Sequence, residues 1–287
     1  MTSGGNTIWQ VGGGRSLTLG TQGHLMAIIN VTPDSFSDGG RHLSVEAAVR
    51  HALACVEAGA SLLDIGGEST RPGAEPVEPA EEQARVLPVI EALSGQTDAL
   101  ISIDTYRAET ARLAIAAGAH IVNDVYGLRH DAQMTKVVAD TGAGLVMMHT
   151  GRGREEDKRA DVVEDQLWFF ENALKTAEEA GIARETIVLD PGFGFAKNRT
   201  EDFALMARFE ELQALRFPFL IGTSRKRFIG SATGREQPSD RDVGTAATTA
   251  LLRLAGASIF RVHDVATNRD ALRIADAVLA ARRETDV

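Results

Sequence analysis

Two hydrophobic periodicities alternate about eight times along this 287-residue chain, and this alternation limits the possible folds more than any other feature. Short runs rich in Ile, Val and Leu are typical of buried strands, and an amphipathic stretch of helical length follows each one. The expected strands are Leu25–Val31, Ser61–Gly66, Ala99–Asp104, His120–Val125, Gly144–His149, Thr186–Asp190, Phe219–Thr223 and Ser258–Asp264. Alternating strands and helices produce a parallel sheet, and eight repeats favour a closed barrel. We therefore expect an α/β protein built as a single (β/α)8 TIM barrel.

The helical stretches between these strands have the length and the terminating residues that such a barrel needs. They are expected near Val45–Ala58, Pro79–Leu93, Ala108–Ala117, Ala132–Thr141, Val162–Ala180, Thr200–Leu215, Arg225–Gly230, Arg241–Leu254 and Ala266–Arg282. Glycines that fit helix C-terminal caps follow several of them, namely Gly59, Gly118, Gly142, Gly181 and Gly256. A doubly wound open sheet is the alternative, but no G-x-G-x-x-G turn follows the first strand.

The sequence shows no linker, so we expect one domain over residues 1–287, with the barrel core at about 24–283. Three glycines at Gly12–Gly14 precede the first strand and predict the turn of a short N-terminal β-hairpin, which we interpret as part of a lid.

Composition excludes several classes of function. The chain carries 30 Lys and Arg against 40 Asp and Glu, a net charge of −10, which argues against nucleic acid or an anionic membrane as the main partner. The one cysteine, Cys55, lies in a helical stretch and is expected to be a buried thiol. The N-terminus lacks the pattern of a signal peptide, and no apolar run approaches the roughly 18 residues of a membrane span. We expect a cytoplasmic protein.

Polar residues stand at the end of every expected strand. In a parallel barrel the carboxyl ends of the strands meet at one mouth, where the chemistry of such folds takes place. A single strand-end Asp or Asn usually caps the next helix, but that explanation does not easily cover eight strands, because buried ionisable groups are costly without a partner or a role. The set therefore predicts a site for a polar, partly anionic ligand; its members are Asn30, Asp64, Glu68, Thr70, Arg71, Asp104, Asn123, Asp124, His149, Asp190, Ser224, Arg225, Lys226, Arg261, His263 and Asp264.

Three loops after strands are unusually informative. Residues 30–40 read NVTPDSFSDGG, where Thr32, Pro33 and Asp34 suit an ordered, mobile loop; Phe36 is either the apolar tip of a flap or packs back on the rim. Residues 66–79, rich in Gly and Pro, suggest a second lid. Residues 190–197 read DPGFGFAK, and the two Phe rings offer flat faces for an aromatic ligand, with core packing equally expected for the first.

Seven motifs in these regions resemble those of the dihydropteroate synthase family, over nearly everything from Leu25 to Ala280. In chain order they are LMAIINVTPDSFSDGG, DIGGESTRPG, SIDT, IVNDV, LDPGFGFAK, IGTSRKRF and FRVHDV. The resemblance implies an enzyme of folate biosynthesis that joins a dihydropterin diphosphate to para-aminobenzoate and releases pyrophosphate. It also implies small-molecule substrates, sulfonamide inhibition and a homodimer.

The resemblance places a pterin ring deep in the barrel, against Asp104, Asn123, Met148, Asp190 and Lys226. A pterin presents a 2-amino group beside a ring N–H, and a carboxylate can accept both hydrogen bonds in parallel, which suits Asp190. Asn123 can pair with ring nitrogens, Lys226 can donate to the pterin carbonyl, and Met148 can pack on the ring.

The same resemblance assigns the diphosphate, a metal ion and the second substrate. The diphosphate is expected at Asn30, Thr70, Arg71, Arg261 and His263. Asn30 also matches the ligand of a Mg²⁺ cofactor in the family. The second substrate is expected between Phe36, Thr70, Pro72, Phe195 and a helix that starts at Ser224, whose N–H groups favour its carboxylate. The residues expected to carry catalysis are Asp104, Asp190, Lys226, Arg261 and His263, while Asp34 either orders its loop or takes a late proton.

Departures from the family pattern and two rival functions complete the prediction. Ala27 and Arg227 replace commoner residues, and TGRGREED follows His149 where many members have Met-x-Gly-x-Pro, which puts the role of that loop in doubt.

A methyltetrahydrofolate-dependent methyltransferase would need a corrinoid partner, and the chain has no cobalamin domain. A non-catalytic pterin-binding paralogue would lose phosphate or loop residues, yet Asn30, Arg71, Arg261 and His263 are present.

Overall fold

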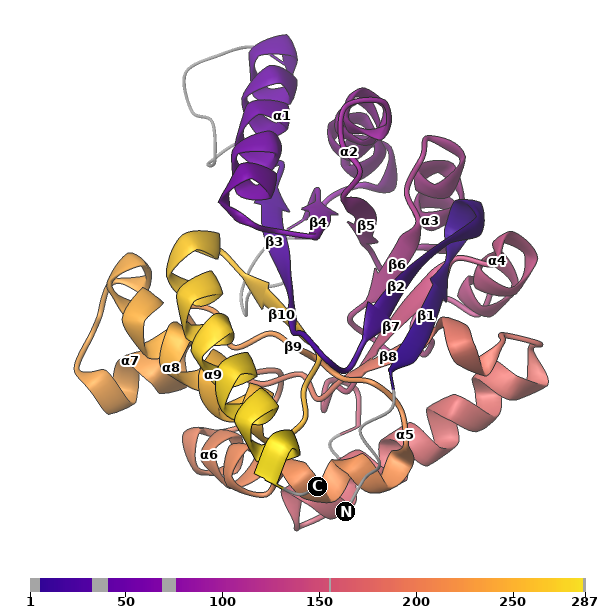
Figure 1. Cartoon of the computed structure of the whole chain (residues 1–287). Helices are drawn as coiled ribbons and strands as arrows, with labels where there is room; N and C mark the ends of the chain where they lie inside the picture. The colour runs from indigo at the N-terminus through magenta and orange to yellow at the C-terminus, as the bar shows by residue number, and fades with distance from the viewer. Residues whose placement is uncertain (1–5, 33–40, 69–75, 155, 286–287) are drawn as a thin grey trace.

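The computed structural model describes residues 6–32, 41–68, 76–154 and 156–285, and it contains an eight-stranded parallel sheet (Figure 1). In spatial order, the strands are β8 (Ile187–Asp190), β7 (Gly144–Met148), β6 (Ile121–Asp124), β5 (Leu100–Asp104), β4 (Leu62–Gly66), β3 (His24–Asn30), β10 (Ile259–Val262) and β9 (Leu220–Ile221). The two ends of this order meet at a parallel bridge between Leu189 and Phe219, where the Leu189 N–H also donates to the Pro218 carbonyl at 3.0 Å. The sheet therefore closes, which confirms the barrel and excludes the open sheet.

Helices cover the outside of this barrel (Figure 1). They are α1 (Arg41–Ala58), α2 (Pro79–Ser94), α3 (Ala108–Ala116), α4 (Met134–Thr141), α5 (Val162–Glu179), α6 (Arg199–Ala207), α7 (Arg227–Thr233), α8 (Asp242–Leu254) and α9 (Val265–Thr285). Most of their bounds agree with the predicted ranges. The sixth ends early, because Arg208 leaves the helical conformation and Phe209–Leu215 continues as a 3₁₀ helix.

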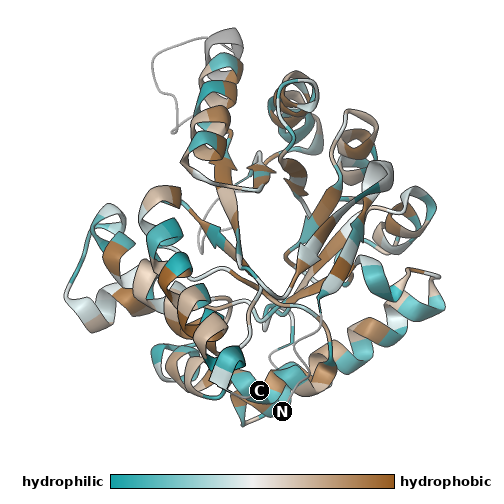
Figure 2. Ribbon diagram, viewed as in Figure 1, coloured by the Kyte–Doolittle hydropathy of each residue, from teal (hydrophilic) through white to brown (hydrophobic). Residues whose placement is uncertain are grey.

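Two apolar layers stabilise the barrel. The outer layer lies between the sheet and the helices, and hydrophilic and hydrophobic residues alternate along those helices (Figure 2). The inner layer takes one residue from each strand: Met26, Leu62, Leu100, Ile121, Val146, Val188, Leu220 and Ile259. Burying each large aliphatic side chain stabilises the fold by about 1.5–3 kcal/mol, so these layers dominate the folding energy.

The predicted N-terminal hairpin is present, and it closes the end of the barrel at which the strands begin. Strands β1 (Thr7–Val11) and β2 (Arg15–Leu19) are joined by the 3₁₀ turn Gly12–Gly14. The Trp9 side chain is 1% exposed, packs on the inner layer and donates to the Thr186 carbonyl at 2.7 Å. Thr186 immediately precedes β8, so the hairpin covers the amino-terminal ends of the strands. The predicted lid therefore lies over the amino-terminal ends of the strands, away from the strand ends that carry the predicted site residues.

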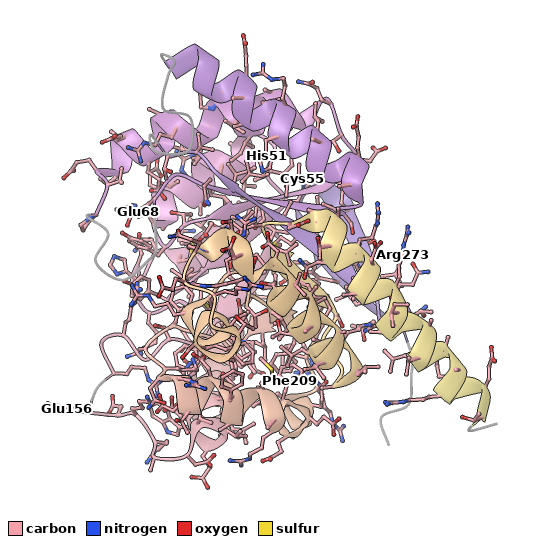
Figure 3. All side chains as sticks on the ribbon, turned by 90° about the vertical axis from the view of Figure 1, so that its left-hand side faces the viewer. His51, Cys55, Glu68, Glu156, Phe209 and Arg273 are labelled. Carbon is pink, nitrogen blue, oxygen red and sulfur yellow. The ribbon has the colours of Figure 1, made fainter. Side chains whose placement is uncertain are left out.

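The prediction for the cysteine holds. Cys55 is 6% exposed within α1, and its Sγ lies 3.8 Å from Nε2 of His51, one turn earlier on the same helix (Figure 3). None of the helices in the described ranges combines the length and apolarity required to cross a bilayer.

Candidate active site

Polar side chains from the strand ends gather at the carboxyl-terminal mouth of the barrel. The loops after β4 and β7 reach the same side of the molecule, as the labelled Glu68 and Glu156 show in Figure 3. The site is therefore built by side chains on rigid strands, with connecting loops around them.

Arg261 connects the strand ends inside this mouth. Its Nε donates to Oδ2 of Asp64 at 2.5 Å, and its Nη2 donates to Oδ2 of Asp104 at 2.6 Å. Asn123 donates from Nδ2 to the same Asp64 oxygen at 3.0 Å. Strands β10, β4, β5 and β6 thus share one network. The sequence indicated Asp64 only as a strand-end residue and missed its role as the carboxylate that positions both Arg261 and Asn123.

Two carboxylate oxygens of this network are left for a ligand. Oδ1 of Asp64 and Oδ1 of Asp104 are buried and have no hydrogen-bond partner among the described residues. Burial raises the pKa of Asp104 to about 7, although the neighbouring Arg261 acts in the opposite direction. Buried acceptors are normally satisfied in native proteins, so these oxygens suit a ligand that brings N–H donors into the barrel.

Asp190 and Lys226 form the second part of the site. Oδ1 of Asp190 accepts a hydrogen bond from the Gly192 N–H at 2.7 Å, and Lys226 donates to the Phe193 carbonyl. Burial raises the pKa of Asp190 against the attraction of Lys226, and burial lowers the pKa of Lys226 to about 8 against the attraction of Asp190. A Cβ on Gly222 would lie 3.6 Å from Asp190 Oδ2 and 3.9 Å from Lys226 Nζ, so the glycine keeps the space between the two groups open.

The loop after β8 is held close to the backbone of β7. Gly192 has φ of 63°, and a Cβ there would lie 2.0 Å from the His149 carbonyl oxygen, so only glycine fits. Phe193 is fully buried and packs with Phe228, so of the two alternatives for this ring the structure shows core packing. Phe195 is partly exposed, and its ring centroid lies 4.6 Å from Lys226 Nζ, which keeps it available to an aromatic substrate.

A chain of hydrogen-bonded polar groups, most of them buried, supports this loop from behind. Lys197 Nζ lies 3.0 Å from both Nδ1 of His149 and the Gly192 carbonyl, and His149 Nε2 lies 2.8 Å from Asp165. Burial and the Lys197 charge lower the pKa of His149 to about 3, so its ring is neutral; Nε2 then carries the proton shared with Asp165, and Nδ1 accepts from Lys197. Asp165 is in turn paired with Arg154 at 2.7 Å. The sequence indicated His149 but missed its partners, which lie far apart along the chain.

The turn after β9 differs from its prediction. The α-helix begins at Arg227, because Arg225 has φ of 57°, which is incompatible with a helix that starts at Ser224. Asp242 holds the Arg225 side chain with two hydrogen bonds of 2.7 and 2.8 Å. Ser224 Oγ instead lies 2.9 Å from His263 Nδ1 and accepts from the His263 N–H at 3.1 Å. Ser224 therefore positions His263 and does not begin a helix.

Asn30 and Met148 occupy the expected strand ends. Met148 is the last residue of β7 and is 3% exposed; Asn30 is the last residue of β3 and is partly exposed. Within the described residues no group of three His, Cys, Asp or Glu side chains forms a metal site. The Asn30 amide has no hydrogen-bond partner among them, so its oxygen can serve a magnesium ion that keeps water and phosphate ligands.

Comparisons with known proteins fix the family. A family model described as pterin binding enzyme matches residues 26–263. The dihydropteroate synthase of Bacillus subtilis is 44% identical over 255 residues, covering 89% of this chain and 88% of the relative. The enzyme of Escherichia coli is 42% identical over 273 residues, covering 94% and 96%. This chain belongs to the dihydropteroate synthase family.

Solved dihydropteroate synthase structures share the whole fold. The Xanthomonas albilineans enzyme with 4-aminobenzoic acid has a TM-score of 0.89 and 46% identity, and the match covers 96% of this chain and 99% of that one. The same enzyme in complex with 7,8-dihydropteroate has a TM-score of 0.85 and 45% identity, covering 93% and 97%. That enzyme therefore binds 4-aminobenzoic acid and 7,8-dihydropteroate on a barrel that closely resembles this one.

Eleven of the residues that the dihydropteroate synthase resemblance assigned to the site lie at the carboxyl ends of strands or in the loops that follow them. Those in the described part are Asn30, Thr32, Asp104, Asn123, Met148, Asp190, Phe195, Ser224, Lys226, Arg261 and His263. The assignments that lie outside the described residues are Pro33, Asp34, Phe36, Thr70, Arg71 and Pro72. Arg107 was missed: it pairs with Glu68 at 2.7 Å and donates to the Val77 carbonyl at 2.7 Å, so it joins the described ends of the loop after β4.

Proposed function

We propose that this chain condenses 6-hydroxymethyl-7,8-dihydropterin diphosphate with para-aminobenzoate, forming 7,8-dihydropteroate and pyrophosphate. The observation that carries the proposal is the set of buried, unsatisfied or ligand-facing groups of Asp104, Asn123, Asp190 and Lys226 inside one barrel mouth. Their donor and acceptor pattern matches the edges of a pterin, and homologous enzymes hold 7,8-dihydropteroate on the same fold.

The pterin ring is held by charge-assisted hydrogen bonds. Asp190 accepts from the 2-amino group and the adjacent ring N–H, because its Oδ2 faces the space that Gly222 leaves open. Lys226 donates to the pterin carbonyl from across that space. Asn123, fixed by Asp64, pairs with ring nitrogens, and Met148 packs on the ring face. These contacts point the exocyclic methylene toward the barrel rim.

The reaction replaces a C–O bond at that methylene with a C–N bond. The departing pyrophosphate takes the bonding electron pair, and the neutral arylamine supplies the new pair and then loses a proton to solvent. Arg261 and His263 stabilise the negative charge on the leaving group. Arg261 has Nη1 available for this purpose, since Nε and Nη2 are bound to Asp64 and Asp104. Burial acts against the charged form, but both carboxylates raise the pKa of Arg261 and keep it charged.

Magnesium is the proposed cofactor. Asn30 is the residue that would hold it, together with oxygens of the diphosphate and water. The ion would neutralise charge on the diphosphate oxygens when bound.

We also propose that the protein is a homodimer and acts in the cytoplasm. Large exposed apolar side chains gather on two helices that pack together: Val243 and Leu251 on α8, and Ile274 and Val278 on α9. Such a patch favours association with a second copy, because exposed apolar side chains on neighbouring helices lose water when they pair. Light scattering on the purified chain tests this, and a monomer at micromolar concentration would contradict it.

The activity is tested with the two substrates and magnesium. Pyrophosphate and dihydropteroate are measured in parallel, with and without para-aminobenzoate. Equal amounts of both products, formed only when the arylamine is present, support the reaction. Binding of the dihydropterin diphosphate without any product would instead assign the chain to non-catalytic pterin binding.

A further inference from the structure

The turn after β9 does not supply the helix start that the sequence predicts for the carboxylate of para-aminobenzoate. Helix α7 begins at Arg227, and the Ser224 hydroxyl is bound to His263. Asp242 holds the Arg225 side chain with two hydrogen bonds. The N–H groups at the start of a helix carry only partial charges, and this helix has 7 residues. A full positive charge from another part of the mouth would hold the carboxylate more firmly.

Two cationic side chains of the described residues lie against the ring of Phe195, which is the aromatic surface expected to contact the arylamine. Lys226 Nζ lies 4.6 Å from the ring centroid, and Arg152 Cζ lies 5.2 Å from it. Lys226 also donates to the Phe193 carbonyl and is assigned to the pterin. Arg152 has no role in the reaction as proposed above, yet its partly exposed guanidinium lies beside the surface that the second substrate would contact.

The loop after β7, which carries Arg152, packs on the turn that carries Phe195. A Cβ on Gly151 would lie 2.8 Å from the Cβ of Ala196, so the glycine allows this close approach. Further along the loop, Lys158 Nζ donates to the Ala196 carbonyl at 3.2 Å. The two segments are therefore joined on both sides of Arg152 in the sequence.

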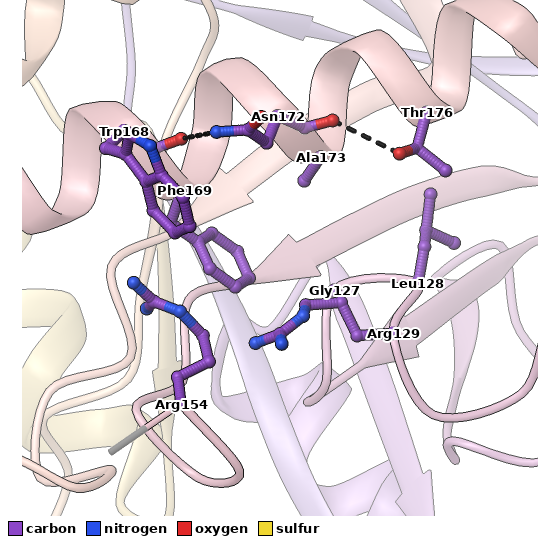
Figure 4. Close-up of a pocket in the computed structure, with 9 residues that line it drawn as sticks. All are labelled: Gly127, Leu128, Arg129, Arg154, Trp168, Phe169, Asn172, Ala173 and Thr176. Carbon is purple, nitrogen blue, oxygen red and sulfur yellow. Dashed lines mark hydrogen bonds between the residues drawn. The ribbon is translucent and has the colours of Figure 1, made fainter. Parts of the chain in front are cut away.

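Arg154 anchors the same loop two residues further on. The residue is 2% exposed, and its Nη2 donates to Asp165 at 2.7 Å. Its Cζ lies 5.0 Å from the ring centroids of both Trp168 and Phe169, and Figure 4 shows the guanidinium beside these two rings. This buried anchor restricts the backbone at Arg152 and keeps its guanidinium beside the Phe195 ring.

We propose that Arg152 binds the carboxylate of para-aminobenzoate while the ring of that substrate lies against Phe195; this inference rests on the proposed reaction. A guanidinium offers parallel N–H donors that fit both oxygens of a carboxylate. A local cation is needed at the mouth, because the chain as a whole carries a net charge of −10 and repels anions.

The position of Arg152 in the sequence makes this contact a property of the chain itself. When TGRGREED is aligned without a gap to the Met-x-Gly-x-Pro pattern that follows His149 in many members of the family, Arg152 stands where that pattern has glycine. Glycine has no side chain that could bind a carboxylate. The departure in this loop therefore adds a residue that determines specificity for an anionic arylamine.

The test compares the steady-state kinetics of the full chain with para-aminobenzoate and with para-aminobenzamide, which keeps the ring and the amine but is neutral. Arg152→Gln should raise KM for para-aminobenzoate roughly tenfold, because one charge-assisted contact is lost. KM for the dihydropterin diphosphate should stay within about twofold of wild type, because the contact involves only the arylamine. The KM of para-aminobenzamide, or its inhibition constant if no product forms, should also stay unchanged. Arg152→Lys keeps the charge without the fork and should give an intermediate KM for para-aminobenzoate.

Arg159→Gln is the matched control, because Arg159 lies in the same loop and its Cζ is 5.1 Å from the ring of Trp168 instead of Phe195. It should leave both KM values as in wild type. An unchanged KM for para-aminobenzoate in Arg152→Gln overturns the proposal and means that Arg152 only packs on Phe195. An equal loss with para-aminobenzamide also overturns it, because the effect would then be independent of the carboxylate.

Calorimetric titration of the full chain with para-aminobenzoate separates this inference from the proposed reaction. Wild type that forms no dihydropteroate, but binds para-aminobenzoate more tightly than Arg152→Gln does, contradicts the reaction and supports the contact. Wild type that forms dihydropteroate with the same KM for para-aminobenzoate as Arg152→Gln supports the reaction and overturns the contact. Wild type that neither binds para-aminobenzoate nor forms product overturns both.

Discussion

Two successive layers inside the barrel have opposite chemistry. The layer beneath the hairpin is apolar and takes residues such as Leu62, Leu100 and Val188 from the strands. Two residues further along the same strands, the next inward positions are Asp64, Ser102, Asn123, Met148, Asp190, Gly222 and Arg261. Side chains on a strand return to the same face every second residue, about 6.6 Å further on. Two residues along each strand therefore separate the core that stabilises the fold from the groups that bind the ligand.

The comparison shows that folding stability and ligand binding depend on separate layers of side chains. The lower layer is closed by Trp9 and contributes hydrophobic burial, whereas the upper layer buries carboxylates whose pKa values are raised by that burial. Buried charge destabilises a fold unless a partner or ligand compensates. Changes in the upper layer should therefore affect catalysis much more than folding, and changes in the lower layer should do the reverse.

Replacing Asp190 tests the upper layer with the largest expected effect. Asp190→Asn keeps the shape but loses the carboxylate that accepts two parallel pterin hydrogen bonds. Each hydrogen bond to a charged group is worth about 1.5–3 kcal/mol, so kcat/KM should fall by roughly 10³ to 10⁴. Urea unfolding should show a free energy within about 1 kcal/mol of wild type. Steady-state kinetics that match wild type would show that Asp190 does not hold the pterin.

Replacing Trp9 tests the lower layer. Trp9→Ala leaves a cavity beneath the inner layer and removes the hydrogen bond to Thr186, so the free energy of unfolding should fall by about 3–5 kcal/mol. The kinetic constants at temperatures where the variant stays folded should equal those of wild type. Trp9→Phe keeps most of the volume and serves as the control. A large change in KM with little loss of stability would contradict the separation of the layers.

The sequence could predict both layers because their residues follow strand periodicity. Asp104, Asn123, Asp190 and Arg261 stand at strand ends, and the parallel barrel alone requires that they meet. The sequence could not predict which of them pair with each other. Asp64 became the partner of both Arg261 and Asn123 only through the register of four strands.

The wrong predictions share a physical cause, which is local conformation that the pattern of hydrophobic residues does not record. The left-handed Arg225 delays the helix after β9. The same kind of local packing decided the alternative left open for Phe193, whose ring packs against Phe228 in the core. The glycine turn of the hairpin does not indicate which end of the barrel it covers. The hydrogen bond from Trp9 to Thr186, just before β8, places it at the amino-terminal end.

The pH dependence of catalysis tests whether the charge of Lys226 in the upper layer is needed for substrate binding. Burial lowers the pKa of Lys226 to about 8, so the group is charged below that pH and loses its proton above it. Because kcat/KM reports the free enzyme, its value for the pterin substrate should fall above about pH 8, by at most about tenfold per pH unit. Lys226→Arg keeps the charge and should lack this limb, whatever its absolute rate. A limb that persists in Lys226→Arg would assign the titration to another group.

The smallest expected effect concerns Lys197, which supports the upper layer from behind. Burial lowers the pKa of Lys197 to about 7 in the folded chain, whereas an unfolded lysine titrates near 10.4. Between these values the unfolded chain binds the extra proton, so this group makes the wild type more stable as the pH rises from about 7 to 10, by at most about 1.4 kcal/mol per unit. His149 titrates near pH 3 when folded and does not contribute in this window. Lys197→Met lacks the effect, so the difference in unfolding free energy between wild type and variant should increase from pH 7 to pH 9. A difference that stays constant with pH would mean that Lys197 is charged in the folded protein and that the loop after β8 is held by an ammonium.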